Sequence, residues 1–189
     1  MSRAYRIQVR DSVRRTIRGE DSVGTCLELL EILPREAMLG LLRDELVGRG
    51  FQPQGDRLVR KGAGLTVTVD PSTGEVEARS EDCEEIELSA ERRGWADEDI
   101  QGARKQAEAT IRAELRQELE ARADDQAQGA RRRATERLEG ALGDIRAELD
   151  AVVNRVTAEA LKRKAAQLGR IKEVTEDVQA GSLTIVVEV

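Results

Sequence analysis

The strongest constraint on the fold is a long proline-free stretch, residues 97–172, in which Ala, Glu, Arg, Leu and Gln dominate. These residue types favour helix formation. Within the stretch, apolar residues repeat at alternating spacings of four and three: Leu138, Leu142, Ile145, Leu149, Val152 and Val156. Such a heptad seam is typical of a helix that packs lengthwise against another element. A helix over the whole stretch would measure roughly 110 Å, so its seam requires a partner along much of its length.

Two partners can cover this seam: the other half of the same arm, or a second chain. Gly129, Gly140 and Gly143 lie in the middle of the stretch, and glycine weakens a helix locally. We therefore expect a coiled-coil-like helical hairpin, with antiparallel helices near 99–128 and 135–172. An intermolecular coiled coil, which would make the protein a homo-oligomer, is the alternative.

Residues 1–96 carry strand patterns instead. Apolar residues alternate with polar ones around residues 5–10, 65–69 and 86–90, as expected for strands with one buried face. A Pro- and Gly-containing turn at 70–74 joins the second strand to a return strand. Apolar spacings of three and four after Pro34 predict a helix over 35–50. These elements predict a small α/β domain, with an antiparallel-rich sheet and one packed helix.

The end of the chain predicts a further strand. Leu183, Ile185 and Val187 alternate with Thr184 and Val186, and a single strand is not stable alone in water. We expect it to return to the N-terminal sheet, with addition to a partner's sheet as the alternative. The predicted fold is thus α+β in three parts: an α/β domain over 1–96, a helical coiled-coil arm over 97–173, and a C-terminal strand segment over 174–189.

Catalytic and metal chemistry has few candidates in this chain. Histidine is absent and there are only two cysteines, Cys26 and Cys83, which removes the usual nucleophile pairs and zinc sites. A cluster of carboxylates has no calcium-loop spacing and is interpreted as a solvated strand face: Glu81, Asp82, Glu84, Glu85 and Glu87. We expect no catalytic residue, no cofactor and no metal. An enzyme that uses carboxylates alone is the least favoured function.

Charge is distributed in blocks along the chain. Residues 1–18 contain six arginines, residues 70–91 contain nine carboxylates, and the formal net charge is −6. A third block is basic and lies on a helix with an apolar stripe; its candidate partner-binding residues are Arg155, Lys162, Arg163, Lys164, Arg170 and Lys172. We interpret it as a protein-docking surface, because no aromatic residue is interleaved for base stacking. Nucleic-acid binding through 1–18 and 155–172 is the alternative.

Three further expectations concern location and single residues. No apolar run reaches the roughly 20 residues of a membrane span, and the first residues lack the apolar segment of a signal peptide. A cytoplasmic protein with free thiols is expected. Cys26 lies in an apolar run and is expected to be buried. Trp95 is expected under the start of the helix, with an exposed partner anchor as the alternative.

Several segments together carry a family resemblance. They are residues 5–10 (YRIQVR), 29–34 (LLEILP), 66–76 (TVTVDPSTGEV), 153–169 (VNRVTAEALKRKAAQLG) and 182–189 (SLTIVVEV). They resemble a bacterial family found with MoxR-type AAA ATPases, von Willebrand factor A proteins and FtsH-like ATPases in FtsH ternary systems. The resemblance implies an accessory role beside an ATPase, in systems of conflict with invaders, and implies no catalytic residue. The resulting hypothesis is a non-enzymatic adaptor or scaffold that docks onto a larger complex containing an AAA ATPase, or onto a von Willebrand factor A protein.

Overall fold

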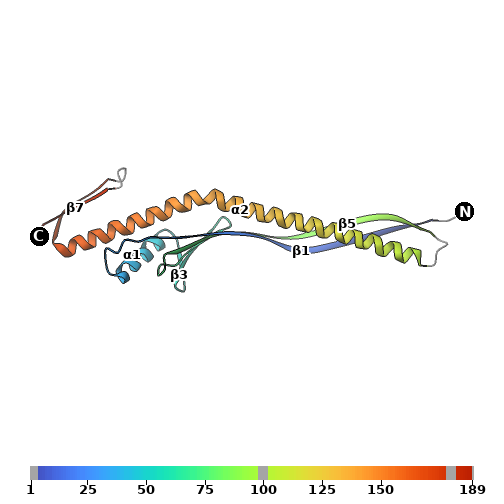
Figure 1. Cartoon of the computed structure of the whole chain (residues 1–189), viewed down its shortest axis with the longest axis horizontal. Coiled ribbons are helices and arrows are strands. Elements are labelled where there is room, and N and C mark those ends of the chain that lie inside the picture. The colour runs from blue at the N-terminus through green and yellow to red at the C-terminus, as the bar shows by residue number, and fades with distance from the viewer. Residues whose placement is uncertain (1–3, 98–101, 178–181, 189) are drawn as a thin grey trace. The chain divides into compact units, whose positions relative to one another are not determined.

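The computed structural model describes residues 4–97, 102–177 and 182–188, which form an α+β fold (Figure 1). The elements are β1 (Ala4–Cys26), α1 (Arg35–Gly48), β2 (Gln52–Gln54), β3 (Arg57–Gly62), β4 (Leu65–Val69), β5 (Glu75–Asp97), α2 (Ala103–Leu168), β6 (Arg170–Asp177) and β7 (Ser182–Glu188). Strands β1 to β5 form an antiparallel sheet in the order β1-β5-β4-β3-β2, and β6 and β7 form a separate two-stranded sheet. The α+β prediction with an antiparallel sheet is confirmed.

The chain divides into two compact units, and each is built from two separate stretches of sequence. Unit 1 comprises Met1–Asp21 and Glu81–Glu136, and unit 2 comprises Ser22–Ser80 and Arg137–Val189. β1, β5 and α2 therefore each contribute residues to both units. Each unit has its own buried apolar residues.

The predicted helical hairpin is wrong. α2 is one helix of 66 residues that continues through Gly129, Gly140 and Gly143, and Figure 1 shows it as an unbroken coil. Each helical glycine costs up to about 1 kcal/mol relative to alanine, whereas burying one large apolar side chain contributes about 1.5–3 kcal/mol. Apart from Leu142, which is 36% exposed, the seam residues are buried in a core with strands and α1 of the same chain, so they need no second half of the arm to cover them. Among the described residues, no helix is long and apolar enough to cross a membrane.

In unit 1, the first half of α2 packs on a two-stranded ribbon formed by β1 and β5. The buried apolar residues are Ile7, Val9, Ile17, Ile86, Leu115, Leu119, Ala123, Ala130 and Ala134. Gly19 lies so close to the helix that a Cβ there would stand 2.3 Å from the carbonyl carbon of Ala130. The short side chains of α2 at Ala123 and Ala130 therefore allow the ribbon to approach the helix backbone closely.

Unit 2 has a larger apolar core, to which α1, the sheet and the second half of α2 all contribute. Its buried residues are Leu33, Met38, Leu41, Leu42, Leu46, Phe51, Leu58, Val67, Val69, Val76, Ala78, Leu138, Ile145, Leu149, Val152, Val156 and Ala160. At its margin, the Arg60 guanidinium forms a bidentate ion pair with Glu148 of α2 and lies 4.8 Å from the Phe51 ring centroid. This contact joins β3 to α2 beside the core.

Local patterns predicted several elements of unit 2 correctly. The helix predicted over 35–50 is α1, and the strand predicted over 65–69 is β4. The predicted turn joins β4 to β5, with Val69 opposite Val76. Asp70 N–H donates to the Glu75 carbonyl at 2.8 Å, and Gly74 has a φ of 77°, which favours glycine. β2 and β3 were not predicted, because their residues are mostly exposed and show little alternation.

The predicted return of the C-terminal strand to the N-terminal sheet is also wrong. β7 pairs in antiparallel fashion with β6, with Val174 opposite Ile185 and Ile171 opposite Val187. The sequence interpretation extended the helix to residue 172 and missed β6. A strand close in sequence is the more accessible partner, because a short loop costs less closure entropy than a long one. Val189, the last residue of the predicted strand, lies outside the described residues.

Candidate functional site

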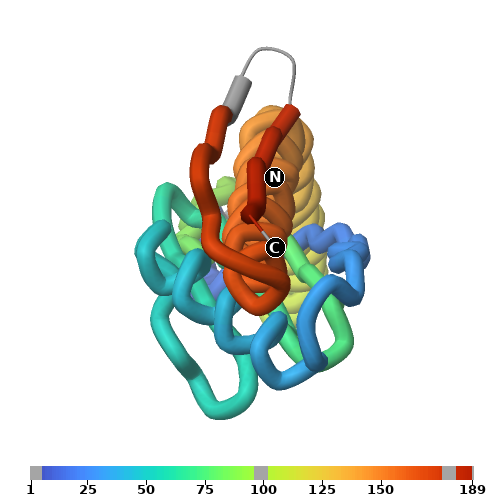
Figure 2. The backbone as a smooth tube through the Cα atoms, turned by 90° about the vertical axis from the view of Figure 1, so that its left-hand side faces the viewer, coloured from blue at the N-terminus to red at the C-terminus, as the bar shows by residue number. Residues whose placement is uncertain are grey.

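The β6–β7 hairpin has an apolar face that lies outside the cores of the described residues. Directly paired residues of antiparallel strands share a face, and the register places five apolar side chains on this one: Ile171, Val174, Leu183, Ile185 and Val187. Val174 is 41% exposed and the others are partly buried. None of them belongs to the apolar clusters formed by the described residues. Within unit 2, the hairpin lies on the opposite side of α2 from α1 and β2–β4 (Figures 1 and 2).

The six basic residues predicted as a docking surface lie in α2 and β6, directly before and within this hairpin. Arg163 pairs with Glu159 at 3.3 Å, and Lys172 pairs with Glu188 at 3.0 Å. Arg155, Lys164 and Arg170 are exposed and have no ion-pair partner among the described residues. The structure therefore leaves a positive charge excess at the end of α2, next to the apolar face of the hairpin.

The helix distributes these charges around its axis. Arg155 and Lys162 are seven residues apart and share one side of α2, whereas Lys164 is nine residues from Arg155 and lies on the opposite side. Leu168, at the last position of the helix, is 64% exposed. A partner that contacts the hairpin would thus meet basic side chains on more than one flank of the helix end.

A second surface of unit 2 lies between β1 and α2. A cavity of about 450 Å³ has Val76, Ala78, Ile145 and Leu149 as its buried apolar wall. Its mouth is formed by residues 23–26 of β1 and by Leu27, which follows the strand, together with Leu142, Arg146 and Asp150 of α2. Residues 23–26 are exposed, and β5 is the only neighbour of β1 in the described sheet. The β1 edge and the cavity together form an open groove, which we name the β1 groove.

The other face of the same sheet edge is acidic. A depression there is lined by residues 24–26, Arg57, Asp70, Glu75 and Glu77, among others. Arg57 lies 3.8 Å from Asp70, while Glu75 and Glu77 are exposed and have no cationic partner among the described residues. Hydrogen bonds from the Ser72 hydroxyl and the Ser72 backbone N–H lower the pKa of Asp70. The depression therefore keeps a net negative charge at neutral pH.

The arginine-rich segment 1–18 is engaged in pairs within unit 1. Its outward side chains face the glutamates of β5 across the ribbon: Arg10 pairs with Glu91, Arg14 with Glu87, and Arg18 with Glu81. The hydrogen bond and charge of Glu87 raise the pKa of Arg14. Residues 1–3 lie outside the described residues. Because these arginines already have carboxylate partners, the segment offers less free charge for nucleic acid than its sequence suggests.

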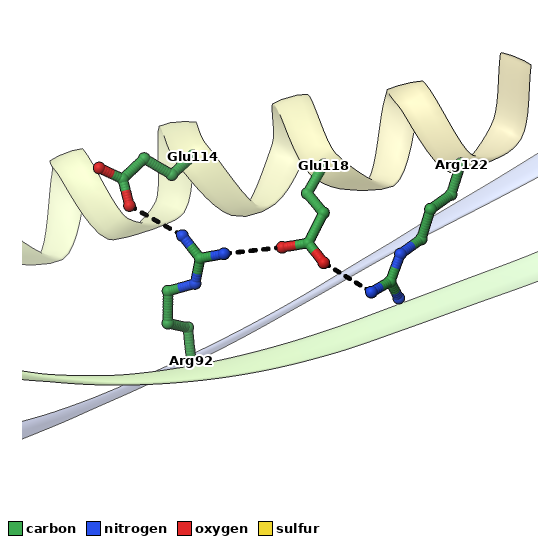
Figure 3. A network of polar contacts seen from close by, with 4 residues as sticks. All are labelled: Arg92, Glu114, Glu118 and Arg122. Atoms are coloured by element: carbon green, nitrogen blue, oxygen red, sulfur yellow. Dashed lines mark hydrogen bonds and ion pairs between the residues drawn. The ribbon is translucent and has the colours of Figure 1, made fainter.

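Further ion pairs join this ribbon to α2, and Figure 3 shows one network of them. Arg92 of β5 bridges Glu114 at 2.9 Å and Glu118 at 2.8 Å, and Glu118 also accepts from Arg122 at 2.6 Å. The acidic cluster predicted as a solvated face joins in similar pairs, since Arg133 contacts Asp82 at 2.8 Å and Glu84 at 3.7 Å. The described residues hold no group of three or more acidic or cysteine side chains positioned for a metal ion.

Two single-residue expectations are corrected by the structure. Cys26 is exposed instead of buried, because it ends an edge strand whose side chains face solvent from residue 22 onward. Trp95 is 68% exposed and does not fill a core under the helix start. Ile111 takes that position instead, with Gly94 leaving the space for it: a Cβ at Gly94 would stand 2.5 Å from Ile111 Cδ1. The alternative interpretation of Trp95 as an exposed side chain therefore agrees with the structure.

Comparison with known proteins gives a single assignment. The model of the family "FtsH ternary system domain X5" matches the chain over residues 1–189. No curated protein and no solved structure matches the chain. The match agrees with the resemblance found in the sequence.

Proposed function

Because the chain belongs to the FtsH ternary system domain X5 family, we propose that it is a non-enzymatic accessory subunit that docks onto the AAA-ATPase-containing assembly of that system. Membership of this family makes it a component of a multi-protein system. The adaptor role, the ATPase and the docking surface are the proposed parts. A von Willebrand factor A protein of the same system is the second candidate partner.

The observation that carries the proposal is the apolar face of the β6–β7 hairpin, which is only partly buried. A two-stranded hairpin is marginally stable by itself, and its apolar face, with Ile185 at the centre, is only partly buried and belongs to no core of the described residues. Contact with a partner would bury them and stabilise the hairpin. Beside it, Arg155, Lys164 and Arg170 have no ion-pair partner among the described residues, and they favour a partner surface with acidic residues around an apolar centre.

The experiment measures binding of the full chain to the purified ATPase of the same system. Ile185→Lys places a cation on the apolar face and should weaken binding about tenfold or more, as expected for a central interface residue. Thr184→Lys is the matched control, since it adds the same charge one residue away on the exposed opposite face. It should change affinity less than about threefold. If Ile185→Lys and Thr184→Lys bind the ATPase with equal affinity, the hairpin is not part of the interface.

The same preparation distinguishes nucleic-acid binding, which shares the basic residues. The triple variant Arg155→Glu, Lys164→Glu, Arg170→Glu should weaken ATPase binding, and Arg112→Glu, an exposed arginine of unit 1, should not. Nucleic-acid binding would be supported instead by a three-part result. The chain would bind duplex DNA or RNA at physiological salt, the triple variant would lose that binding, and Ile185→Lys would keep it.

A further inference from the structure

The exposed sheet edges of this protein differ in how they are protected against pairing with another strand. Edge strands are commonly protected by charges, proline or a bulge. β2 is three residues long and contains Pro53, and β6 carries Arg170, Lys172 and a register shift. The ribbon strands of unit 1 carry arginines and glutamates. Two described stretches lack these features: residues 183–187 of the proposed docking hairpin, and residues 23–26 of β1.

Residues 23–26 also have the backbone geometry to accept a strand. Leu27 N–H donates to the Gly74 carbonyl at 2.7 Å, on the side of the sheet interior. Successive N–H groups of an extended chain point in opposite directions, so the N–H groups of Gly24 and Cys26 point toward the free edge. An extended peptide alongside them would continue the sheet by main-chain hydrogen bonds, as in other cases of strand addition.

The two sides of this edge specify the side chains of such a strand. Alternate residues of an added strand would project into the β1 groove, whose cavity of about 450 Å³ is walled by Val76, Ala78, Ile145 and Leu149. Those residues should be apolar. The intervening residues would face the depression with Glu75 and Glu77, which lack cationic partners among the described residues. Those residues should be basic.

We propose that the β1 edge at residues 23–26 is a strand-addition site for a partner segment in which apolar residues alternate with lysine or arginine. The site is separate from the hairpin of the proposed function and does not depend on it. Charge also disfavours β7 of a second copy as the occupant. Its exposed-face residues Ser182, Thr184 and Val186 carry no cation, and Glu188 would add a like charge beside Glu75 and Glu77.

The test titrates the full chain with a short peptide that alternates lysine and valine. Two comparison peptides are an alternating glutamate–valine peptide and a lysine–valine peptide of the same composition arranged in blocks. The first peptide should bind at least about tenfold more tightly than either of the others, because only it matches both faces. Equal binding of all three, or no binding, overturns the proposal.

Variants of the chain locate the bound peptide. Gly24→Pro removes one edge N–H and should abolish binding, whereas Gly24→Ala keeps it and adds a Cβ 3.8 Å from the nearest atom, Val76 O, an ordinary contact. If Gly24→Pro does not fold, Leu142→Arg replaces it in the test. This variant places a cation at the partly exposed mouth of the β1 groove and should also abolish binding. Binding that persists in a folded Gly24→Pro or in Leu142→Arg overturns the proposal.

Charge reversal and oligomeric state complete the test. Glu75→Lys with Glu77→Lys should reverse the preference toward the glutamate–valine peptide, and Glu36→Lys with Glu139→Lys, on exposed helix positions, should not. Ile185→Lys should leave peptide binding unchanged, which separates this site from the hairpin. If the chain dimerises without peptide and Gly24→Pro abolishes the dimer, then a second copy of the chain occupies the site. That result would overturn the partner proposed here.

Discussion

The two halves of α2 have the same backbone geometry but bury their apolar stripes in different ways. In unit 1 the stripe begins with Leu115 and Leu119, continues with Ala123, Ala130 and Ala134, and faces a two-stranded ribbon. In unit 2 it includes Leu149 and Val152 and faces a core that also contains α1. The three alanines of the stripe in unit 1 bury little apolar area. The packing of unit 1 around them therefore depends more on close backbone approach and on ion pairs across its surface. Unit 2 depends more on apolar volume.

This difference teaches that one periodic seam can serve two kinds of packing. A heptad pattern determines which side of a helix is buried, but side-chain size determines what can cover that side. Alanine allows a twisted ribbon to lie close to the helix, as the contact of Gly19 with Ala130 illustrates. Around Leu149 and Val152 the buried layer is thicker, because α1 and the sheet both contribute to it in unit 2.

The largest expected effect is in the core of unit 2. Leu149→Asp places an unpaired carboxylate at a position that is 5% exposed and should lower the free energy of unfolding by about 4 kcal/mol. Leu142→Asp, about two helical turns away but 36% exposed, should cost less than about 1 kcal/mol. Denaturant unfolding measures both. Similar losses in the two variants would show that the exposed stretch of the seam is covered in solution.

The next effect tests close approach in unit 1. Gly19→Ala would place a Cβ 2.3 Å from the Ala130 carbonyl carbon, so β1 must move away from α2 at a cost of about 1–3 kcal/mol. Hydrogen exchange should rise in residues 15–21 and 81–88 and stay nearly constant in α1. Gly24→Ala is the control, with no contact closer than 3.8 Å. Unchanged exchange in the ribbon would mean that unit 1 is not packed as tightly as the structure shows.

A smaller effect tests the contribution of ion pairs to unit 1. Arg92→Gln breaks two contacts between the ribbon and α2 and should cost about 1 kcal/mol or less, because the side chains are partly exposed. Arg104→Gln breaks only the pair with Glu108 within α2 and should cost about 0.3–0.5 kcal/mol. Added salt should shrink both losses through screening. A loss for Arg92→Gln that salt does not reduce would argue for packing by its side chain instead of charge.

The smallest effect concerns the turn of unit 2 that contains Asp70. Hydrogen bonds from Ser72 lower the pKa of Asp70 in the folded state, so its ionised form stabilises folding above the ordinary pKa. That contribution is lost as the pH falls below the ordinary pKa and through the lowered one. Ser72→Ala should raise the pKa of Asp70, measured by NMR titration of its side-chain carboxyl. Ser12→Ala, in unit 1, should leave it unchanged.

Some parts of the fold could be predicted because their signals are local. The turn from Asp70 to Gly74 contains its own hydrogen-bonding side chain and its own glycine, and the strands on either side alternate clearly. α1 begins directly after Pro34, which suits the start of a helix, and places Leu41, Leu42 and Leu46 on one face. Such features need no distant contact to be read correctly.

The candidate surfaces were predicted less completely. The basic residues near the end of α2 were visible as a charge block, and the apolar alternation of β7 was visible as a strand. Their neighbour β6 was not, because Arg170, Lys172 and Glu173 interrupt its alternation. The β1 groove could not be predicted, since its wall combines Val76 of β5 with Ile145 and Leu149 of α2. No short stretch of sequence contains all three residues.

The sequence by itself determined that most of residues 97–172 are helical, which side of the helical stretch is apolar, and that the chain alternates as strands before and after it. Helix propensity and periodicity are properties of neighbouring residues, so they can be recognised from the sequence alone. Only the tertiary structure decided that the helix stays unbroken through Gly129, Gly140 and Gly143, that strands cover its seam, and that β7 pairs with β6. These outcomes depend on the burial gained when distant segments meet, which exceeds the local cost of the glycines and which no local pattern encodes.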